Sequence, residues 1–161
     1  MLPHNLQVLN EVRQIVVELS DIQQGISLYM EAFEYYRSHF PDGADPTDGT
    51  AGGFGDGQIL VLADLLQASG DHEKVIQTLR SGTRWLQGRK DEIFWDVVID
   101  DREFDLPNVV RSSDNGTTPA GHYPMDINLR HRLGIARLML GDIDEGKVSF
   151  IRLEMTSQQR W

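Results

Sequence analysis

The densest group of side chains capable of acid–base chemistry is the acidic run over residues 100–105, which holds four carboxylates. A pair of carboxylates with separated pKa values can serve as acid and base, and clustered oxygens can hold a divalent ion. Both functions need groups that converge across a cleft, and consecutive residues on a non-helical insertion do not supply this by themselves. We interpret the run as solvated or partner-facing. A carboxylate-based hydrolase built on Asp100, Asp101 and Glu103 is kept as an alternative.

The other candidates for cofactor chemistry lack the required spacing. The five histidines do not form an HExxH motif or another ligand pattern. The glycine-rich stretch 52–57 has no lysine followed by Ser or Thr, so it is not a phosphate loop. The absence of cysteine excludes disulfides, thiolate metal sites and thiol nucleophiles. We therefore expect no catalytic residue, no metal, no cofactor and no small-molecule substrate.

The net charge of −10, from 15 basic and 25 acidic residues, argues against direct contact with a nucleic-acid backbone or an anionic membrane surface. Residues 128–161 are the exception, with six basic and four acidic residues. No apolar run approaches the roughly 20 residues that span a bilayer. The N-terminal residues do not resemble a signal peptide. DNA is therefore expected to be an indirect partner only.

The apolar residues repeat every three or four positions in three segments, 5–39, 58–86 and 128–155, and each segment reads as two helices joined by a tight turn. Gly70-Asp71 and Gly141-Asp142 mark two of the turns, because glycine ends a helix and aspartate caps the next one. The units align with one another, which predicts an all-α helical repeat.

Two insertions separate the repeats. Residues 41–57 are almost entirely Gly, Asp, Pro and Thr, and we expect them to be flexible and unfolded. Residues 87–127 begin with an aromatic and acidic part, 92–105, which we expect to lie against the repeats. Their polar part, 112–121, is expected to form a mobile loop.

The repeats resemble tetratricopeptide repeats. Leu62-Ala63 with Gly70-Asp71 matches that motif, as does Leu133-Gly134 with Gly141-Asp142, whereas Val75 stands where alanine is usual. The resemblance implies a right-handed superhelix of stacked hairpins that forms one domain over residues 1–161.

The segment 83–105 is similar to a segment of the tetratricopeptide subunit of fungal transcription factor IIIC. Its matching pieces are Arg84 to Arg89, Phe94-Trp95-Asp96 and Asp100 to Glu103. The helix that follows the next loop in that family matches here at Leu129-Arg130 to Leu133-Gly134. The resemblance implies a nuclear, non-catalytic protein scaffold, a fragment of a larger subunit, that serves promoter recognition for RNA polymerase III. Its implied partners are factor IIIB components and other factor IIIC subunits. A free-standing tetratricopeptide adaptor or co-chaperone is the alternative.

A tetratricopeptide stack presents the first helix of each hairpin along a groove that can hold a partner segment. The alternative is that these positions are ordinary surface or are covered by an insertion. Counting back from each turn, the predicted groove positions are Asn10, Gln14, Val17, Leu60, Asp64, Gln67, His131, Arg132, Ile135 and Met139.

Two further groups allow two interpretations each. Arg130, Arg132 and Arg137 give the last hairpin a basic helix, which we interpret as a solvated face because surface ion pairs contribute only about 0–1 kcal/mol. The alternative is a socket for an acidic segment, for example the run 100–105. The aromatic residues at 85, 94 and 95 are expected to cover the helical stack, and the alternative is a platform for a partner.

Overall fold

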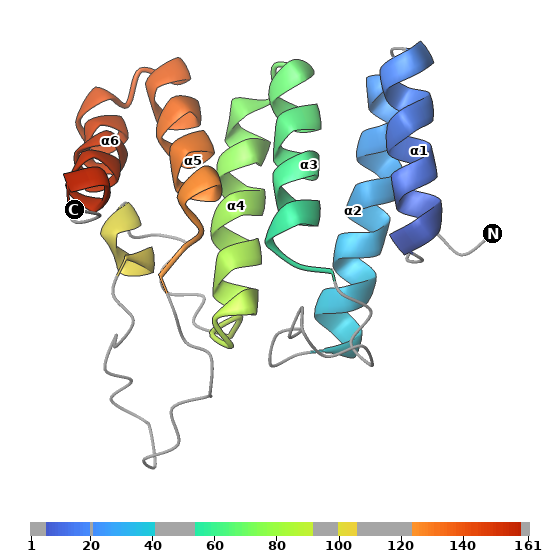
Figure 1. Ribbon diagram of the computed structural model, residues 1–161, viewed down its shortest axis with the longest axis horizontal. Helices are drawn as coiled ribbons and strands as arrows, with labels where there is room; N and C mark the ends of the chain where they lie inside the picture. Colours follow the sequence, from blue (N-terminus) through green and yellow to red (C-terminus); the bar gives the residue numbers. More distant parts are fainter. Residues whose placement is uncertain (1–5, 20, 41–53, 92–99, 106–123, 159–161) are drawn as a thin grey trace.

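The part of the chain described by the computed structural model is entirely helical and contains no strand, which confirms the predicted all-α class (Figure 1). This part comprises residues 6–19, 21–40, 54–91, 100–105 and 124–158. Its elements are α1 (Leu6–Leu19), α2 (Ile22–His39), α3 (Asp56–Ala68), α4 (His72–Leu86), the short 3₁₀ helix η3 (Asp101–Phe104), α5 (Ile127–Met139) and α6 (Ile143–Gln158).

Consecutive helices pair into three hairpins, α1–α2, α3–α4 and α5–α6, which stand in a row (Figure 1). Each helix contacts the next one along the chain, and α3 also contacts α5. The turns within the hairpins all lie at one edge of the row, which we call the turn edge. The C-terminal ends of α2 and α4 and the N-terminal ends of α3 and α5 lie at the opposite edge.

The turns of the second and third hairpins have the same construction. Gly70 and Gly141 adopt φ of 85° and 83°, a left-handed conformation in which a residue with a side chain would be strained. The aspartate after Gly70 caps α4 by accepting a hydrogen bond from the Lys74 amide at 3.2 Å. Asp21 caps α2 in the same way, accepting from Gln24 N at 3.2 Å.

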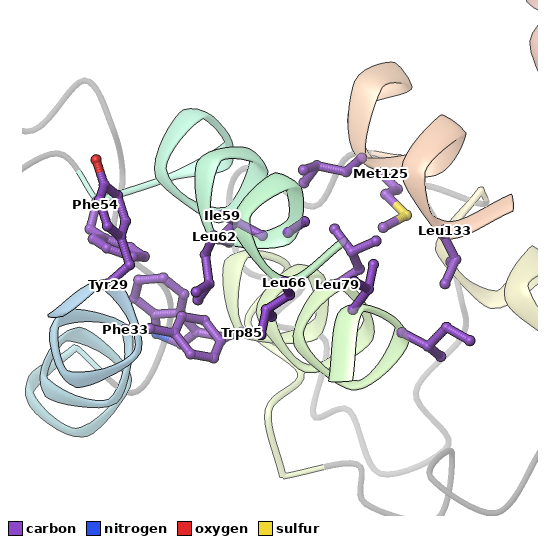
Figure 2. Close-up of a cluster of buried hydrophobic side chains, with 14 of the residues drawn as sticks. Tyr29, Phe33, Phe54, Ile59, Leu62, Leu66, Leu79, Trp85, Met125 and Leu133 are labelled. Carbon is purple, nitrogen blue, oxygen red and sulfur yellow. The ribbon is translucent and has the colours of Figure 1, made fainter. Parts of the chain in front are cut away.

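A continuous apolar core connects the hairpins (Figure 2). Helices α1 to α5 each contribute buried apolar residues to this core, which is shared between hairpins. The core members drawn in Figure 2 include Leu62, Leu66, Leu79, Met125 and Leu133, all at most 7% exposed.

Trp85 anchors the junction between the first two hairpins. Its side chain is fully buried, its Nε1 donates a hydrogen bond to the Phe40 carbonyl at 2.6 Å, and its ring packs against Phe33 and Phe54. Tyr36 stacks on both Phe40 and Phe54, at 5.8 and 5.1 Å between ring centroids. We call these five aromatic residues the aromatic clamp. The expectation that Trp85 packs within the stack is confirmed, whereas Phe94 and Trp95 lie outside the described residues.

The structure describes ordered residues before the boundary of the first insertion that was expected at about residue 57. Phe54 is fully buried in the clamp, Gly55 precedes the helix, and α3 begins at Asp56. Burying a Phe side chain contributes about 1.5–3 kcal/mol, and this gain outweighs the flexible composition around it. Residues 41–53, the rest of the segment expected to be unfolded, lie outside the described part.

The ends of the second insertion are also built into the fold. Gln87 and Arg89 are buried after the end of α4, and Met125 is buried before α5, with its amide donating to the Phe104 carbonyl at 2.8 Å. Residues 92–99 and 106–123 lie outside the described part, and with them the loop expected at 112–121.

Helices α5 and α6 approach closely because small residues face each other. A Cβ atom added to Gly134 would lie 2.7 Å from the Cβ of Ser149, and one added to Gly146 would lie 2.6 Å from a methyl carbon of Leu138. These glycines occupy positions where the repeat pattern demands small residues.

Candidate functional site

The predicted groove positions of the second and third hairpins lie on the neighbouring helices α3 and α5. Asp64 and Arg132 join these helices through an ion pair of 2.6 Å between Oδ1 and Nε. Both side chains remain partly accessible, at 48% and 28% exposure. Leu60 and Ile135 are half-buried beside them. This face of α3 and α5 thus offers a charged pair flanked by partly exposed apolar side chains.

Other predicted groove residues have different surroundings. His131 is half-buried and meets the ring of Phe150 on α6 edge-on, at 5.5 Å between centroids. The Oε1 atom of Gln67 is buried and accepts no hydrogen bond within the described part. Met139 lies at the end of α5 and is 61% exposed. In the first hairpin Asn10 is exposed, and the side chains at positions 14 and 17 lie outside the description.

The most highly organised polar cluster is elsewhere: buried arginines of α4 and α5, and Arg89 after α4, hold the acidic run 100–105. Asp101 is its first centre, with a fully buried side chain. Arg137 binds it with two hydrogen bonds, Nε to Oδ2 at 3.0 Å and Nη2 to Oδ1 at 2.9 Å. Arg80 and Arg130 place further guanidinium nitrogens 3.8 and 3.9 Å from its carboxylate oxygens.

Glu103 is the second centre, and its side chain is also fully buried. Three arginines surround it: Arg80 Nη2 at 3.2 Å, Arg84 Nε at 3.6 Å and Arg89 Nη1 at 3.6 Å. Burial raises the pKa of Glu103, while the charges of Arg84, Arg89 and Arg80 act in the opposite direction. The guanidinium carbons of Arg84 and Arg89 also lie over the ring of Phe104, 6.0 and 5.7 Å from its centroid.

The third centre connects the run to the last hairpin. Arg130 binds Asp105 through Nε at 3.0 Å and Nη2 at 3.2 Å, and its Nη1 donates to Ser149 Oγ at 2.7 Å. Glu145 of α6 accepts a hydrogen bond from the Asp101 amide at 2.5 Å. We call the eight residues Arg80, Arg84, Arg89, Asp101, Glu103, Asp105, Arg130 and Arg137 the ionic cluster.

The ionic cluster corrects the interpretation of the basic helix as a solvated face. Arg130 and Arg137 are 1% and 7% exposed, and they form the socket for the acidic run that was the alternative. Only Arg132 projects from the fold in the expected way, and it binds Asp64 instead. Burial removes water from the guanidiniums, and the paired carboxylates compensate for this loss. An isolated buried arginine would lack that compensation.

The carboxylates once considered for a hydrolase are thereby engaged as structural partners. Asp101 and Glu103 are buried and paired with arginines. Asp100 is partly exposed and binds the adjacent Arg102 at 2.8 Å. Residues 92–105 were expected to lie against the repeats. Residues 100–105, the described part of this segment, pack against them.

A pocket of about 370 Å³ runs along α4 beside the ionic cluster. Its described lining comes from one stripe of the helix, and sequence reasoning did not single it out. The four-residue spacing of the stripe is the signal that could have indicated it. The lining residues are Ile76, Gln77, Arg80, Ser81 and Arg84.

The burial of arginines makes the accessible surface more acidic than the composition indicates. Of the twelve Lys and Arg residues whose burial is described, five are buried; of the seventeen Asp and Glu residues, two are. The basic segment at the end of the chain therefore loses Arg130 and Arg137 as contacts for a phosphate backbone.

A half-buried carboxyl at the start of α3 has a perturbed acidity. Burial, reinforced by the nearby charge of Asp126, raises the pKa of Asp56 to about 6. Within the described ranges no three His, Asp or Glu side chains come together as ligands for a metal ion. No helix there has the length and apolar character to cross a membrane.

No family model matches the sequence. The chain is 28% identical over 153 residues to transcription factor tau subunit sfc4 of Schizosaccharomyces pombe, an alignment that covers 92% of this chain and 14% of the relative. It is 33% identical over 91 residues to the transcription factor tau 131 kDa subunit of Saccharomyces cerevisiae, covering 54% of this chain and 9% of the relative. The chain thus corresponds to about one seventh of the first relative's length. The resemblance predicted from segment 83–105 is confirmed: this chain is a homologue of fungal subunits of transcription factor tau, also called factor IIIC.

Proposed function

We propose that this chain is a non-catalytic protein-interaction scaffold within a subunit of transcription factor IIIC, acting in the nucleus in transcription by RNA polymerase III. The names of its two relatives support the transcription role, and the alignment with the first relative extends over most of the chain. The proposed partners are other factor IIIC subunits and components of factor IIIB, with DNA contacted only indirectly.

The architecture proposed for this scaffold is a right-handed tetratricopeptide superhelix that forms one domain over residues 1–161. Three observations support it: the row of hairpins, the two Gly-Asp turns with left-handed glycines, and the close approach of α5 and α6 at Gly134 and Gly146.

The observation that best supports a scaffold over an enzyme is the ionic cluster. Arg84 to Arg89 and Asp100 to Glu103 are the pieces on which the family resemblance rests, and the described residues among them hold one helix hairpin against the next. A motif whose residues have a structural role is typical of repeat proteins, which function by presenting an extended binding surface.

The proposed partner surface includes the face of α3 and α5, with the Asp64–Arg132 pair at its centre and half-buried Leu60 and Ile135 beside it. An extended or helical segment of a partner would lie across this face, and its polar groups would replace or bridge the ion pair. The exposed Asn10 would extend the same surface onto α1.

Capture of purified proteins tests this proposal. The chain is immobilised and offered factor IIIB components and the other factor IIIC subunits one at a time, and we expect at least one to be retained. Asp64→Lys should weaken that retention about tenfold, a loss expected when an interface charge is reversed. Glu34→Lys makes the same change at an exposed site of α2 that forms only a surface ion pair with Arg37, and it is the matched control.

Retention of none of these proteins would refute the assignment to factor IIIC. Equal effects of the two substitutions would leave the factor IIIC role but remove the face of α3 and α5 as its site. A substrate turnover lost on replacing Asp101 and Glu103 by Asn and Gln, with the fold intact, would favour the hydrolase instead.

A further inference from the structure

The large exposed hydrophobic side chains of the described part are concentrated in the last hairpin. Met139, Leu140 and Ile143 surround its turn and are 61%, 47% and 47% exposed, and Ile151 on α6 is 57% exposed. We call the first three the apolar tip. Grouped apolar side chains on a surface are costly in water and mark sites of interaction.

The fold does not require an apolar tip, as the second hairpin shows. Its turn has the same geometry, with a glycine φ of 85° compared with 83° in the third hairpin. In each turn the glycine amide donates a hydrogen bond of 3.0 Å to the carbonyl three residues earlier. Aligned on the Gly-Asp pair, however, the second hairpin has small or polar residues where the third has apolar ones. These residues are Ala68, Ser69 and His72.

Acidic side chains surround the apolar tip. Asp142 and Asp144 lie on the same turn. The Asp142 side chain is 38% exposed and pairs with Arg137 at 3.6 Å, and Asp144 is exposed. The turn of the second hairpin, at the same edge, adds the exposed Asp71 and Glu73. Each of the two turns is followed by one exposed lysine, Lys74 and Lys147, so the acidic groups outnumber the basic ones. This field repels a second acidic tip and an anionic membrane, and it attracts a basic protein segment.

We propose that the apolar tip is a docking site for a basic amphipathic helix of a protein partner. The helix would place its apolar side chains on Met139, Leu140 and Ile143, and its Lys and Arg residues toward Asp142 and Asp144. Helices that bury an apolar face on a partner are a recurring mode of protein recognition. The inference rests on the proposed scaffold role for its biological meaning, but its surface lies at the turn edge and shares only Met139 with the predicted groove.

A titration tests this proposal without knowledge of the natural partner. The ¹⁵N-labelled chain is titrated with a synthetic peptide of about 18 residues, in which leucines form one face of the helix and lysines form the opposite face. We expect shifts of amide resonances centred on residues 139–144, and weaker binding at higher salt because the attraction is partly ionic.

The triple variant Met139→Ala, Leu140→Ser, Ile143→His gives the third turn the residues of the second and should therefore fold. It should bind the peptide at least about tenfold more weakly, since it removes three apolar contacts. The converse triple variant of the second turn, Ala68→Met, Ser69→Leu, His72→Ile, should gain a second set of shifted resonances around residue 70.

Four outcomes would overturn the proposal. Unchanged affinity in the first triple variant would show that the peptide binds elsewhere. Equal binding of a leucine and glutamate peptide would remove the charge argument. Self-association that is lost in the variant, measured by sedimentation, would identify a second copy as the occupant, and tip-dependent binding to phosphatidylserine vesicles would identify a membrane. The capture experiment with factor IIIB and IIIC proteins can fail while the titration succeeds, so the two proposals are separable.

Discussion

The ionic cluster predicts a steep gradient of stability within one short segment of the chain. Asp100, Asp101 and Asp105 are chemically identical and lie within six residues, but their side chains are 36%, 0% and 12% exposed. Replacing each by Asn removes the charge and preserves the shape. The free energy of unfolding should fall most for Asp101→Asn, less for Asp105→Asn and least for Asp100→Asn.

The magnitude follows from the partners of each carboxylate. Asp101 accepts two charge-assisted hydrogen bonds from Arg137 and lies within 4 Å of Arg80 and Arg130. Its neutralisation leaves buried guanidiniums undercompensated, which costs about 3–5 kcal/mol. Asp105 has a single bidentate partner at the edge of the cluster, so its loss should cost less. The exposed pair of Asp100 with Arg102 should contribute little.

Urea unfolding followed by circular dichroism measures these differences. With a slope of about 2 kcal/mol per molar urea, Asp101→Asn should lower the midpoint by about 1.5–2.5 M. Added salt should change the effect of Asp100→Asn more than that of Asp101→Asn, because buried pairs are poorly screened. A double-mutant cycle with Arg137→Met should give a coupling energy of about 0.5–3 kcal/mol.

Equal midpoints for Asp100→Asn and Asp101→Asn would refute the reasoning. That result would mean that the acidic run is not held against the helices in solution. A midpoint raised by Asp101→Asn would mean that the desolvation of the carboxylate outweighs its attraction to the arginines.

Three further perturbations follow from the packing. Gly134→Ala should destabilise the fold by about 1–3 kcal/mol, because the new methyl group would lie 2.7 Å from the Cβ of Ser149. Gly57→Ala is the control: its methyl group would enter open space, and the variant should be neutral or stabilising in thermal unfolding. Asp56→Asn should stabilise the protein at pH 7 and lose this advantage as the pH falls from 6 to 4, because a folded-state pKa of about 6, above the unfolded value of 3.8, makes the native carboxyl gain stability on protonation. Unfolding at a series of pH values measures this change, and an effect of the substitution that does not vary with pH would mean that the Asp56 carboxyl is solvated. Trp85→Phe should cost about 1–3 kcal/mol, because the backbone carbonyl at the end of α2 loses its buried donor; an unchanged melting temperature would contradict the 2.6 Å bond.

The helices could be predicted from the sequence because their signals are local. Apolar periodicity and the Gly-Asp turns act over a few residues, and they identify all the paired helices in the described part. Phe54 could not be assigned in this way, since its partners Tyr36 and Trp85 belong to other elements and its sequence neighbours are typical of a flexible segment.

The ionic cluster could be predicted only as an alternative to a solvated face, because a charged residue looks the same in sequence whether it is solvated or buried. Arg80 is 23 residues from Glu103 and Arg137 is 36 from Asp101, so no local pattern joins them. Two signals were available. Arg80 and Arg84 are one turn apart on a single helix face, and every base of the cluster is arginine, the residue suited to bidentate, buried pairing.

The aromatic clamp has a consequence for how this protein can change in evolution and in the laboratory. It fixes Phe40 and Phe54, the residues that bracket positions 41–53, through partners that lie outside that interval. The entropy of closing a loop between these two residues rises by only about 0.6 kcal/mol for each doubling of its length. Insertions and deletions among homologues should therefore accumulate between Phe40 and Phe54. The same interval is the natural place to introduce a protease site or a fluorescent reporter while the five residues of the clamp keep their identity.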